Sequence, residues 1–194
     1  LCSTKFDVEF MGRAAHAGLE PNAGSNALAA ACMATTAMLG IARHRDGMTR
    51  INIGQLNGGS GRNVIPGHAR LQGETRGATP ALNDYMFGQV QQIVEGAAMM
   101  QGASYLIRKQ GEAIGIENSP ALLEEIVPLA EALKLETIHS RRFGASEDAG
   151  FLIERVQQNG GQAAYLILGA NLAAPHHHPE FDFDEAVLEH GVAL

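Results

Sequence analysis

Two groups of histidines are the first candidates for chemistry. His16 lies in the segment GRAAHAGLEP, where small residues on both sides leave room for a substrate or a second chain to approach. His176, His177 and His178 form a run before Pro179, and imidazole is the commonest metal ligand in proteins. Three adjacent residues cannot all turn to one ion, so one or two of them at most would bind it. The alternatives are a loop histidine with a satisfied ring and a solvated polar loop.

Asn63 and Arg76 are candidates for binding a substrate. Asn63 ends the glycine-rich turn GGSGRN, and Arg76 lies near the end of the strand that follows. Arginine binds carboxylates through two parallel hydrogen bonds, although Glu74 on the same strand phase makes a surface ion pair the alternative. The turn is not a phosphate loop, because no Lys-Ser or Lys-Thr follows it and it leads into a strand. Nucleophilic catalysis is unsupported, because the chain has no G-x-S-x-G motif and neither cysteine has a histidine partner in sequence.

The overall composition argues against two classes of partner. A formal net charge of −7 argues against general nucleic-acid binding, which requires a basic patch. Apolar residues make up 45% of the chain, which is enough for a core. No run approaches the roughly 18 to 20 consecutive apolar residues of a membrane span. Two cysteines without a CxxC motif, together with the lack of a signal-peptide pattern, favour a reducing compartment, the cytoplasm.

Strand and helix patterns alternate over the first part of the chain. They predict strands at residues 5–11, 49–56, 64–77 and 104–110, and helices at 22–43 and 80–101. The order β-α-β-β-α-β is typical of a ferredoxin-like fold, with one four-stranded antiparallel sheet and two helices on one face. Pro66 requires an edge position or an interruption of pairing. The expected core stripe of the first helix is Leu28, Cys32, Thr35 and Leu39, widened by Ala31, Met38 and Ala42. The expected stripe of the second helix is Leu82, Met86, Val90, Ile93, Ala97 and Met100.

The remainder of the chain, residues 115–194, has the pattern of an α/β domain. A helix that begins at Ser119-Pro120 and bends at Pro128, and a second helix with Ser146 as its N-cap, precede the apolar run AAYLILG. Such a run indicates a parallel strand that is buried on both faces. Two helices and one strand cannot build a parallel sheet, so we expect an incomplete domain, and both ends of the chain read as cuts through a longer protein.

Three segments together resemble the M20 family of metallopeptidases and amidohydrolases. They are FMGRAAHAGLEPNAGSNALAAA, SGRNVIPGHARLQGETRG, and GASEDAG followed by HHHPEFDFDEAVL, in this order. The resemblance covers essentially all 194 residues. It implies a ferredoxin-like lid and dimerisation domain over residues 1–114, and the C-terminal part of a zinc-peptidase-like α/β catalytic domain over residues 115–194. By the same resemblance, we expect the N-terminal half of the catalytic domain, with its metal ligands and general-base glutamate, to be missing.

The resemblance also implies an activity and roles for particular residues. The whole enzyme would hydrolyse the amide that joins p-aminobenzoate to glutamate, a folate breakdown product, with two divalent ions, zinc or manganese, holding a bridging water. His16 matches a catalytic histidine that reaches into the partner subunit's site and hydrogen-bonds the oxyanion. Asn63 matches a lid asparagine that also acts in trans. Arg76 matches the arginine that binds the substrate's α-carboxylate, and His177 matches the last metal ligand.

The same resemblance implies how the protein assembles and whether the isolated chain is active. The lid implies a homodimer, and this type of hydrolase can use a second subunit. Glu147 and Asp148 match an acidic pair near the site, with no assigned role. Because His177 is its single family metal ligand, the chain alone is expected to hold no metal pair and to be inactive. The alternative class is a stand-alone ferredoxin-like dimerisation or ligand-binding module, with residues 115–194 as a docking tail.

Overall fold

The computed structural model describes residues 1–138, 147–176 and 178–194. Its contacts divide the chain into two compact units. Of the described residues, the first unit holds Leu1–Gly115 and 147–150, and the second holds 116–138 and those from Phe151 to Leu194. Among the described residues, no helix is long and apolar enough to cross a membrane.

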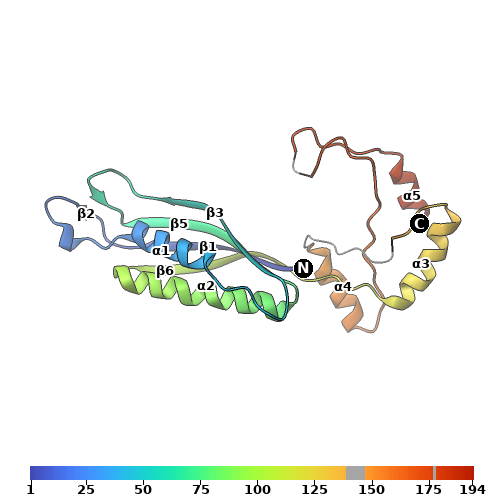
Figure 1. Cartoon of the computed structure of the whole chain (residues 1–194), viewed down its shortest axis with the longest axis horizontal. Helices are drawn as coiled ribbons and strands as arrows, with labels where there is room; N and C mark the ends of the chain where they lie inside the picture. Colours follow the sequence, from blue (N-terminus) through green and yellow to red (C-terminus); the bar gives the residue numbers. More distant parts are fainter. Residues whose placement is uncertain (139–146, 177) are drawn as a thin grey trace. The chain divides into compact units, whose positions relative to one another are not determined.

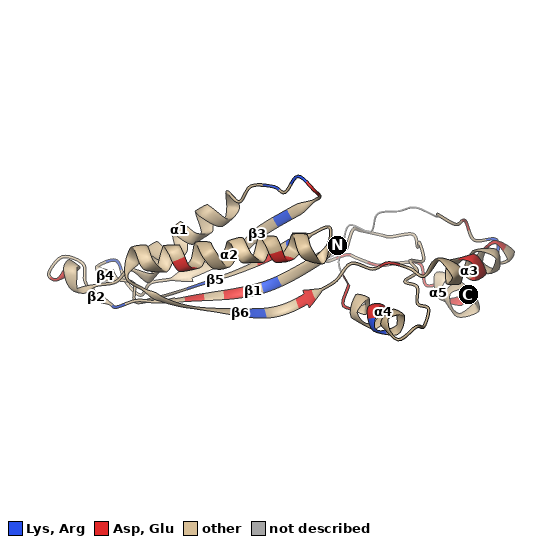
Figure 2. Ribbon diagram, turned by 90° about the horizontal axis from the view of Figure 1, so that it is seen from below, with Lys and Arg blue, Asp and Glu red and all other residues tan. Residues whose placement is uncertain are grey.

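Four strands of the first unit form an antiparallel sheet in the order β3-β5-β1-β6 (Figure 1). Helices α1 and α2 cover one face of this sheet and leave the other face open (Figure 2). The bounds are Cys2–Met11 for β1, Ala27–Leu39 for α1, Thr49–Gly58 for β3, His68–Gly77 for β5, Pro80–Gln101 for α2 and Ser104–Ala113 for β6. This arrangement confirms the ferredoxin-like fold expected from the sequence.

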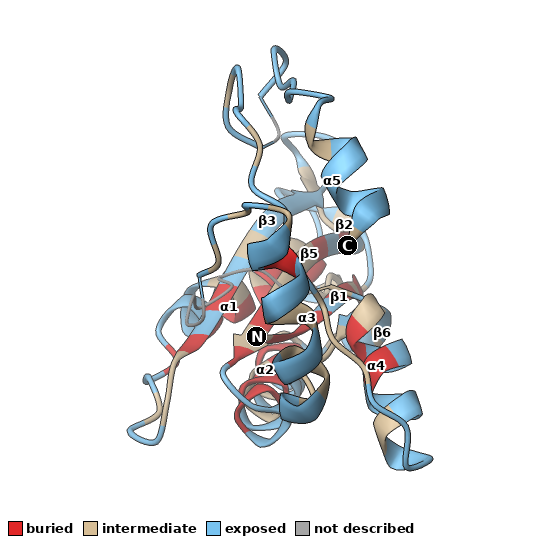
Figure 3. Cartoon of the chain, turned by 90° about the vertical axis from the view of Figure 1, so that its right-hand side faces the viewer, coloured by how far each residue is buried: buried red, intermediate tan, exposed pale blue. Residues whose placement is uncertain are grey.

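The core lies between the sheet and the two helices, where buried positions gather on β1, β5, α1 and α2 (Figure 3). Alternate residues of β1 point to the helices, and Phe6, Val8 and Phe10 are at most 1% exposed. The alternation predicted for the third strand is also confirmed, because Ala69 and Leu71 are fully buried. Helix α2 has the predicted bounds, and the glycine that follows it adopts the left-handed conformation that ends many helices.

Helix α1 differs from its prediction in both length and orientation. It begins only after Asn26, whose side chain accepts a hydrogen bond from the Ala29 N–H (2.9 Å), so the predicted helix 22–43 is too long. The predicted stripe is wrong at Cys32 and Leu39, because Cys32 is exposed and Leu39 is 54% exposed. The buried face contains the predicted Ala31 and Met38 together with Ala27, Ala30 and Ala34. Alanine side chains are short, so this face lets the helix axis approach the sheet closely.

The end of α2 gives a second correction to the predicted core. Met100 is 63% exposed, although it continues the spacing of the predicted stripe. The buried stripe passes through the predicted Ala97 and, next to it, through Val94 and Ala98. Because consecutive helical residues are rotated by about 100°, a stripe centred on these positions turns Met100 away from the core.

The strand predicted over residues 64–77 is interrupted as Pro66 requires. Val64–Ile65 forms the short strand β4, which pairs with β2 (Ala15–His16), and β5 begins at His68. Proline has no backbone N–H to donate to a ladder, so pairing stops there. The break separates a small two-stranded ribbon from the main sheet.

A buried polar chain fixes the far end of β5 against α2. The Thr75 hydroxyl donates to Asn83 Oδ1 (3.0 Å), and Asn83 Nδ2 donates to Thr4 Oγ1 (2.8 Å). A Cβ atom at Gly77 would lie 2.3 Å from the Asn83 backbone nitrogen, so only glycine permits this close approach. These contacts with α2 therefore fix the position of the strand segment that carries Arg76.

The second part of the chain contains α3 (Pro120–Ala132), α4 (Ala149–Gln158) and α5 (Val187–Ala193). Pro128 lies within α3, as predicted, and Ser146 lies outside the described residues. The buried strand predicted at residues 163–169 is wrong, because this segment is not a strand and Ile167 is 60% exposed. A buried parallel strand needs strands on both sides. The described part of the second unit supplies only one isolated bridge, Leu172 to Phe183.

Candidate active site

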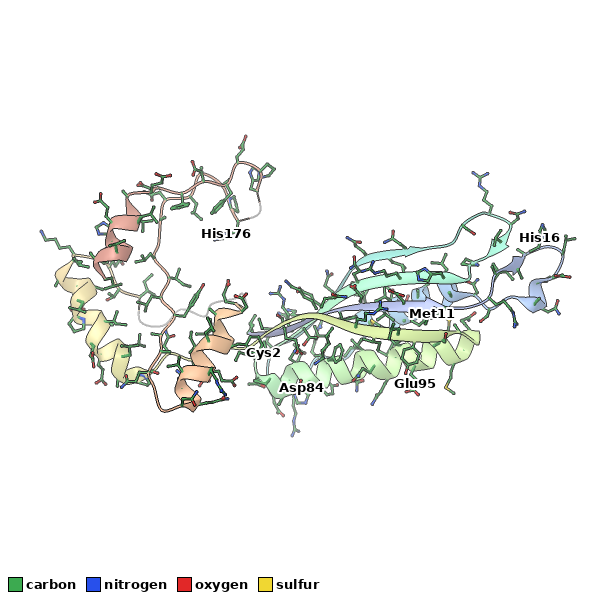
Figure 4. All side chains as sticks on the ribbon, turned by 180° about the vertical axis from the view of Figure 1, so that it is seen from behind. Cys2, Met11, His16, Asp84, Glu95 and His176 are labelled. Atoms are coloured by element: carbon green, nitrogen blue, oxygen red, sulfur yellow. The ribbon has the colours of Figure 1, made fainter. Side chains whose placement is uncertain are left out.

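The ribbon of β2 and β4 brings His16 and Asn63 together from distant parts of the sequence. His16 pairs with Val64, and the Ala17 N–H donates to the Asn63 carbonyl (2.9 Å). Asn63 Nδ2 lies 3.5 Å from His16 Nε2. Two residues predicted to act together are therefore neighbours at one end of the first unit, where Figure 4 labels His16.

The turn after His16 fixes the proton position on its imidazole ring. Nδ1 accepts hydrogen bonds from the backbone N–H groups of Gly18 (3.2 Å) and Leu19 (3.1 Å). A nitrogen that accepts two N–H groups carries no proton, so the neutral ring carries its proton on Nε2. The Glu20 N–H donates to the His16 carbonyl (3.0 Å) and closes the turn before the short 3-10 helix Pro21–Ala23.

This arrangement presents two N–H donors side by side on an exposed surface. His16 Nε2–H and the Asn63 amide can both donate to a single oxygen placed between them. Paired donors that are fixed before the reaction stabilise the oxyanion of an acyl-transfer transition state. The small residues on either side of His16, noted in the sequence, leave the ring exposed. The bonds to Nδ1 satisfy one ring nitrogen of this loop histidine, and its exposed Nε2–H is the group that could serve as an oxyanion donor.

Arg76 lies on the open face of the sheet and is engaged by Glu74. Arg76 Nε donates to Glu74 Oε1 (3.0 Å), and Nη2 donates to Oε2 (3.2 Å). Both side chains are about one third exposed or less. They line an open pocket of about 480 Å³, together with residues of β3 that include Arg50 and Asn52. The ion pair considered in the sequence analysis is therefore present, beside a pocket that a small anion can enter.

Arg76 does not lie near His16 in the same chain. Figure 4 labels His16 and Cys2 at opposite ends of the first unit, and Cys2 pairs with Gly77, the neighbour of Arg76. Strand β5 begins at His68, shortly after the β2–β4 ribbon that carries His16, and Arg76 lies eight residues further along β5. At about 3.3 Å per residue, this stretch of β5 is roughly 26 Å long. One chain therefore cannot apply both groups to one small molecule.

The middle of the open face carries a buried carboxylate. Asp7 accepts hydrogen bonds from Arg70 Nη2 (2.6 Å), Gln72 Nε2 (2.8 Å) and Gln110 Nε2 (2.9 Å), and its side chain is 6% exposed. Burial by itself would raise the pKa of Asp7. The bonds from Gln72 and Arg70, the charge of Arg70 and the bond from Gln110 outweigh burial and lower this pKa below 3.8. Asp7 is thus an ionised structural group.

The histidine run is described only at its two ends. His177, the predicted metal ligand, lies outside the described residues. The His176 ring stacks on Phe181, with centroids 5.1 Å apart, and His178 Nδ1 accepts from the Glu180 N–H (3.1 Å). Across the described ranges, no three His, Cys, Asp or Glu side chains come together in a way that could hold a metal ion.

Sequence reasoning did not single out Arg50 as a site residue. The alternation of residues 49–56 places it on the polar phase of a strand, which is an ordinary position for an arginine. Only the strand register shows that Arg50 lies directly opposite Arg76. The register could not be read from either strand alone.

Comparison with known proteins defines the class to which this fold and these residues belong. Residues 3–98 match the family model of the peptidase dimerisation domain, M20_dimer. This match identifies the first unit as similar to the dimerisation domain of the M20 peptidases. A solved dinuclear metal-binding peptidase of this family from Bacillus subtilis shares the fold, with a TM-score of 0.68 and 20% identity over 98% of this chain and 46% of its own.

Particular relatives are more similar in sequence. The chain is 47% identical to a Haemophilus influenzae homolog of a p-aminobenzoyl-glutamate hydrolase subunit, over 100% of this chain and 46% of the relative. It is 42% identical to the indole-3-acetyl-aspartic acid hydrolase of Enterobacter agglomerans, over 97% of this chain and 44% of the relative. The structure of an aminobenzoyl-glutamate utilization protein from Klebsiella pneumoniae has a TM-score of 0.78 and 41% identity, over 84% of this chain and 42% of its own. The chain thus spans less than half the length of these relatives.

Proposed function

We propose that this chain is part of a metal-dependent amidohydrolase that cleaves p-aminobenzoyl-glutamate to p-aminobenzoate and glutamate. The names of the relatives from Haemophilus influenzae and Klebsiella pneumoniae support this substrate. The relative from Enterobacter agglomerans is named for a conjugate of aspartic acid, so its name also describes an amide of an acidic amino acid. We propose residues 1–114 as the lid and residues 115–194 as part of the catalytic domain.

The paired donors of His16 and Asn63 are the observation that carries this proposal. Attack on an amide places negative charge on its carbonyl oxygen, and His16 Nε2–H and the Asn63 amide are available to stabilise it. Arg76 would hold the α-carboxylate of the glutamate half and so orient the amide. His16 and Asn63 would thus contact the reacting carbonyl, and Arg76 would contact the α-carboxylate of the same substrate.

The separation of these groups supports action across a dimer. His16 and Arg76 lie toward opposite ends of the first unit, and β5 alone spans roughly 26 Å from His68 to Arg76, which is much longer than an amide of one acyl group and one amino acid. A complete site would therefore combine His16 and Asn63 of one protomer with Arg76 of the other. This requires a homodimer through the first unit, which the matched dimerisation domain supports.

Helix α1 and the neighbouring edge strand β3 are the surface we assign to this dimer. Helix α1 has no charged residue on any face, and helices that are apolar all round are normally buried. Strand β3 has a single charged residue, Arg50, whereas the opposite edge, β6, carries Arg108, Lys109 and Glu112. Charged edge strands resist pairing with another chain. The β3 edge is therefore the better site for joining two sheets.

The metal centre of the whole enzyme remains part of the proposal. Two divalent ions, zinc or manganese, would lower the pKa of a bound water so that it attacks the amide at neutral pH. His177 is proposed as one ligand. Since the described residues gather no metal-binding cluster, we assign only substrate-directed roles to them. The relative from Haemophilus influenzae is named for one subunit of a hydrolase, which supports a second, different subunit as a partner of this protein.

The alternative, a stand-alone ferredoxin-like module, is less well supported. The similarity to the relative from Haemophilus influenzae covers 100% of this chain, and so extends through residues 115–194 rather than ending with the lid. A docking tail would have no reason to resemble a catalytic domain. A binding module would also make no use of the paired donors at His16.

Hydrolysis provides the decisive test. The longer protein that contains this chain, loaded with zinc or manganese, should release p-aminobenzoate from p-aminobenzoyl-glutamate, and the 194-residue chain alone should not. Failure of the longer protein with either metal, both with and without a second subunit, would overturn the proposed function. Turnover by the isolated chain would contradict the assignment of the other metal ligands to the rest of the enzyme.

A further inference from the structure

Two arginines lie directly opposite each other on the open face of the sheet. The register of β3 and β5 pairs Arg50 with Arg76, and the next pair on the same face is Asn52 with Glu74. Opposed residues of an antiparallel pair have Cα atoms about 4.5 to 5.5 Å apart. Like charges directly opposite each other destabilise a sheet, so this pair needs a compensating anion.

Glu74 compensates only one of the two arginines. Both of its carboxylate oxygens bind the Arg76 guanidinium. Arg50 Nη1 donates to the neighbouring carbonyl of Thr49 (2.9 Å), and within the described ranges no carboxylate lies within ion-pair distance of Arg50. One positive charge of the pair therefore has no counter-charge from the described side chains.

The surroundings of this pair favour a small anion. The open pocket of about 480 Å³ is lined by Arg50, Asn52, Glu74 and Arg76 and, on its apolar side, by Leu1, Met48 and Ile51. Lys5 of β1 lies across the sheet from Glu74 on its other side. The local charge is therefore positive, although the whole chain carries a net charge of −7.

We propose that Arg50 is a specificity-determining residue that binds the second carboxylate of a substrate whose first carboxylate is held by Arg76. This inference rests on the proposed function, in which Arg76 holds the α-carboxylate of an acyl-amino acid. Because the two guanidinium groups come from directly opposed positions of neighbouring strands, one small dicarboxylate can contact both. The pocket therefore selects amides of dicarboxylic amino acids over amides of neutral ones.

Binding to the 194-residue chain tests the pocket without any hydrolysis. Glutarate and butyrate, which have two and one carboxylates, would be titrated into the chain while the side-chain Nε–H signals of ¹⁵N-labelled arginine are followed by NMR. Loss of one charged hydrogen-bonding partner should weaken glutarate binding roughly tenfold in Arg50→Gln, to the level of butyrate. Arg45→Gln is the matched control, because the Arg45 side chain is 91% exposed and pairs only with nearby Asp46. Equal binding of glutarate and butyrate, or an unchanged preference in Arg50→Gln, would overturn the inference.

A kinetic comparison separates this inference from the proposed function. In the longer enzyme, kcat/KM would be measured for p-aminobenzoyl-glutamate and for p-aminobenzoyl-norvaline, which lacks the second carboxylate. Arg50→Gln should lower kcat/KM roughly tenfold for the glutamate conjugate and leave the norvaline conjugate nearly unchanged. If wild type hydrolyses both conjugates equally, Arg50 has no such role while the proposed function stands. If it hydrolyses neither while glutarate still binds through Arg50, the proposed function fails and the carboxylate site stands.

Discussion

Glu74 binds Arg76 through two parallel hydrogen bonds, from Nε to Oε1 (3.0 Å) and from Nη2 to Oε2 (3.2 Å). The carboxylate of Glu74 therefore occupies the edge of the guanidinium that a substrate carboxylate would otherwise prefer. A ligand must either displace Glu74 or use the other N–H groups of Arg76. In both cases Glu74 opposes the binding of anions in the pocket.

Removing this internal carboxylate charge should strengthen anion binding. Glu74→Gln keeps the size of the side chain but removes its negative charge, and we expect the chain to bind glutarate roughly threefold to tenfold more tightly. The NMR titration described above measures the change, with the exposed Glu95→Gln on α2 as the control. Weaker binding would mean that Glu74 orients Arg76 for its ligand rather than competing with it.

His16→Ala should reduce the rate of the longer enzyme more than its substrate affinity. An oxyanion donor acts mainly on the transition state, so kcat should fall by roughly 10²–10³ while metal content and dimerisation persist. His44→Ala is the control, since this histidine of the first unit contacts Asp46 and Tyr85 rather than the paired donors. A fall in kcat of similar size in both variants would argue against a specific role for His16.

Subunit exchange tests whether His16 acts across the dimer. A His16→Ala protomer would be mixed with a protomer that lacks the general-base glutamate of the catalytic domain. The His16→Ala protomer keeps its own base and receives an intact His16 from its partner, so one site of each mixed dimer should be complete. Activity should recover to about half of wild type per mixed dimer. No recovery, after exchange has been verified, would place His16 in the site of its own protomer.

Introducing a charge on α1 should disrupt the proposed dimer. Cys32 is exposed near the middle of α1, and Cys32→Glu would bury a carboxylate in an apolar interface. Sedimentation equilibrium should show a dimeric wild-type chain and a dissociation constant at least about tenfold higher for the variant. Met99→Glu is the control, because Met99 is 77% exposed and lies on α2 rather than on the proposed interface of α1 and β3. A monomeric wild-type chain at high concentration would contradict the interface.

Asp7 should make the stability of the chain depend on pH in acid. Its pKa is lower in the folded protein, so its contribution is present at neutral pH and is lost as the pH falls below about 4 and through the lowered value. Asp7→Asn should lower the free energy of unfolding at pH 7 by about 1–2 kcal/mol, because Arg70 loses a charged partner. Urea denaturation at pH 7, 5 and 3 should show this difference shrinking in acid. The exposed Asp84→Asn serves as the control, and a difference that is constant with pH would contradict the assignment.

Local patterns were sufficient to predict most elements of the first unit. The N-terminal Pro80 and the following Gly102 mark the ends of α2, and the alternation around Leu71 identifies the buried face of β5. Pro66 correctly indicated the break in pairing. These features are encoded by neighbouring residues, so they can be read without knowing the fold.

Predictions that depended on partners elsewhere in the chain were wrong. Leu39 fits a helical stripe on α1, but the close approach of α1 to the sheet selected the alanine face. Met100 fits the stripe of α2, but the face of α2 that packs on the sheet is centred on Val94, Ala97 and Ala98. The apolar run at residues 163–169 resembles a buried strand, but the described residues supply no neighbouring strands to pair with it. Hydrophobic periodicity indicates that a face can be buried and does not indicate what buries it.

The sequence by itself determined the ferredoxin-like order of elements and the residue types available for chemistry. Only the tertiary structure decided how those residues are grouped. The β2–β4 ribbon brings Asn63 beside His16, and the register of β3 with β5 places Arg50 opposite Arg76. Strand register joins residues that are far apart in the sequence, and it depends on the packing of the whole sheet. No local pattern could therefore have shown either pair.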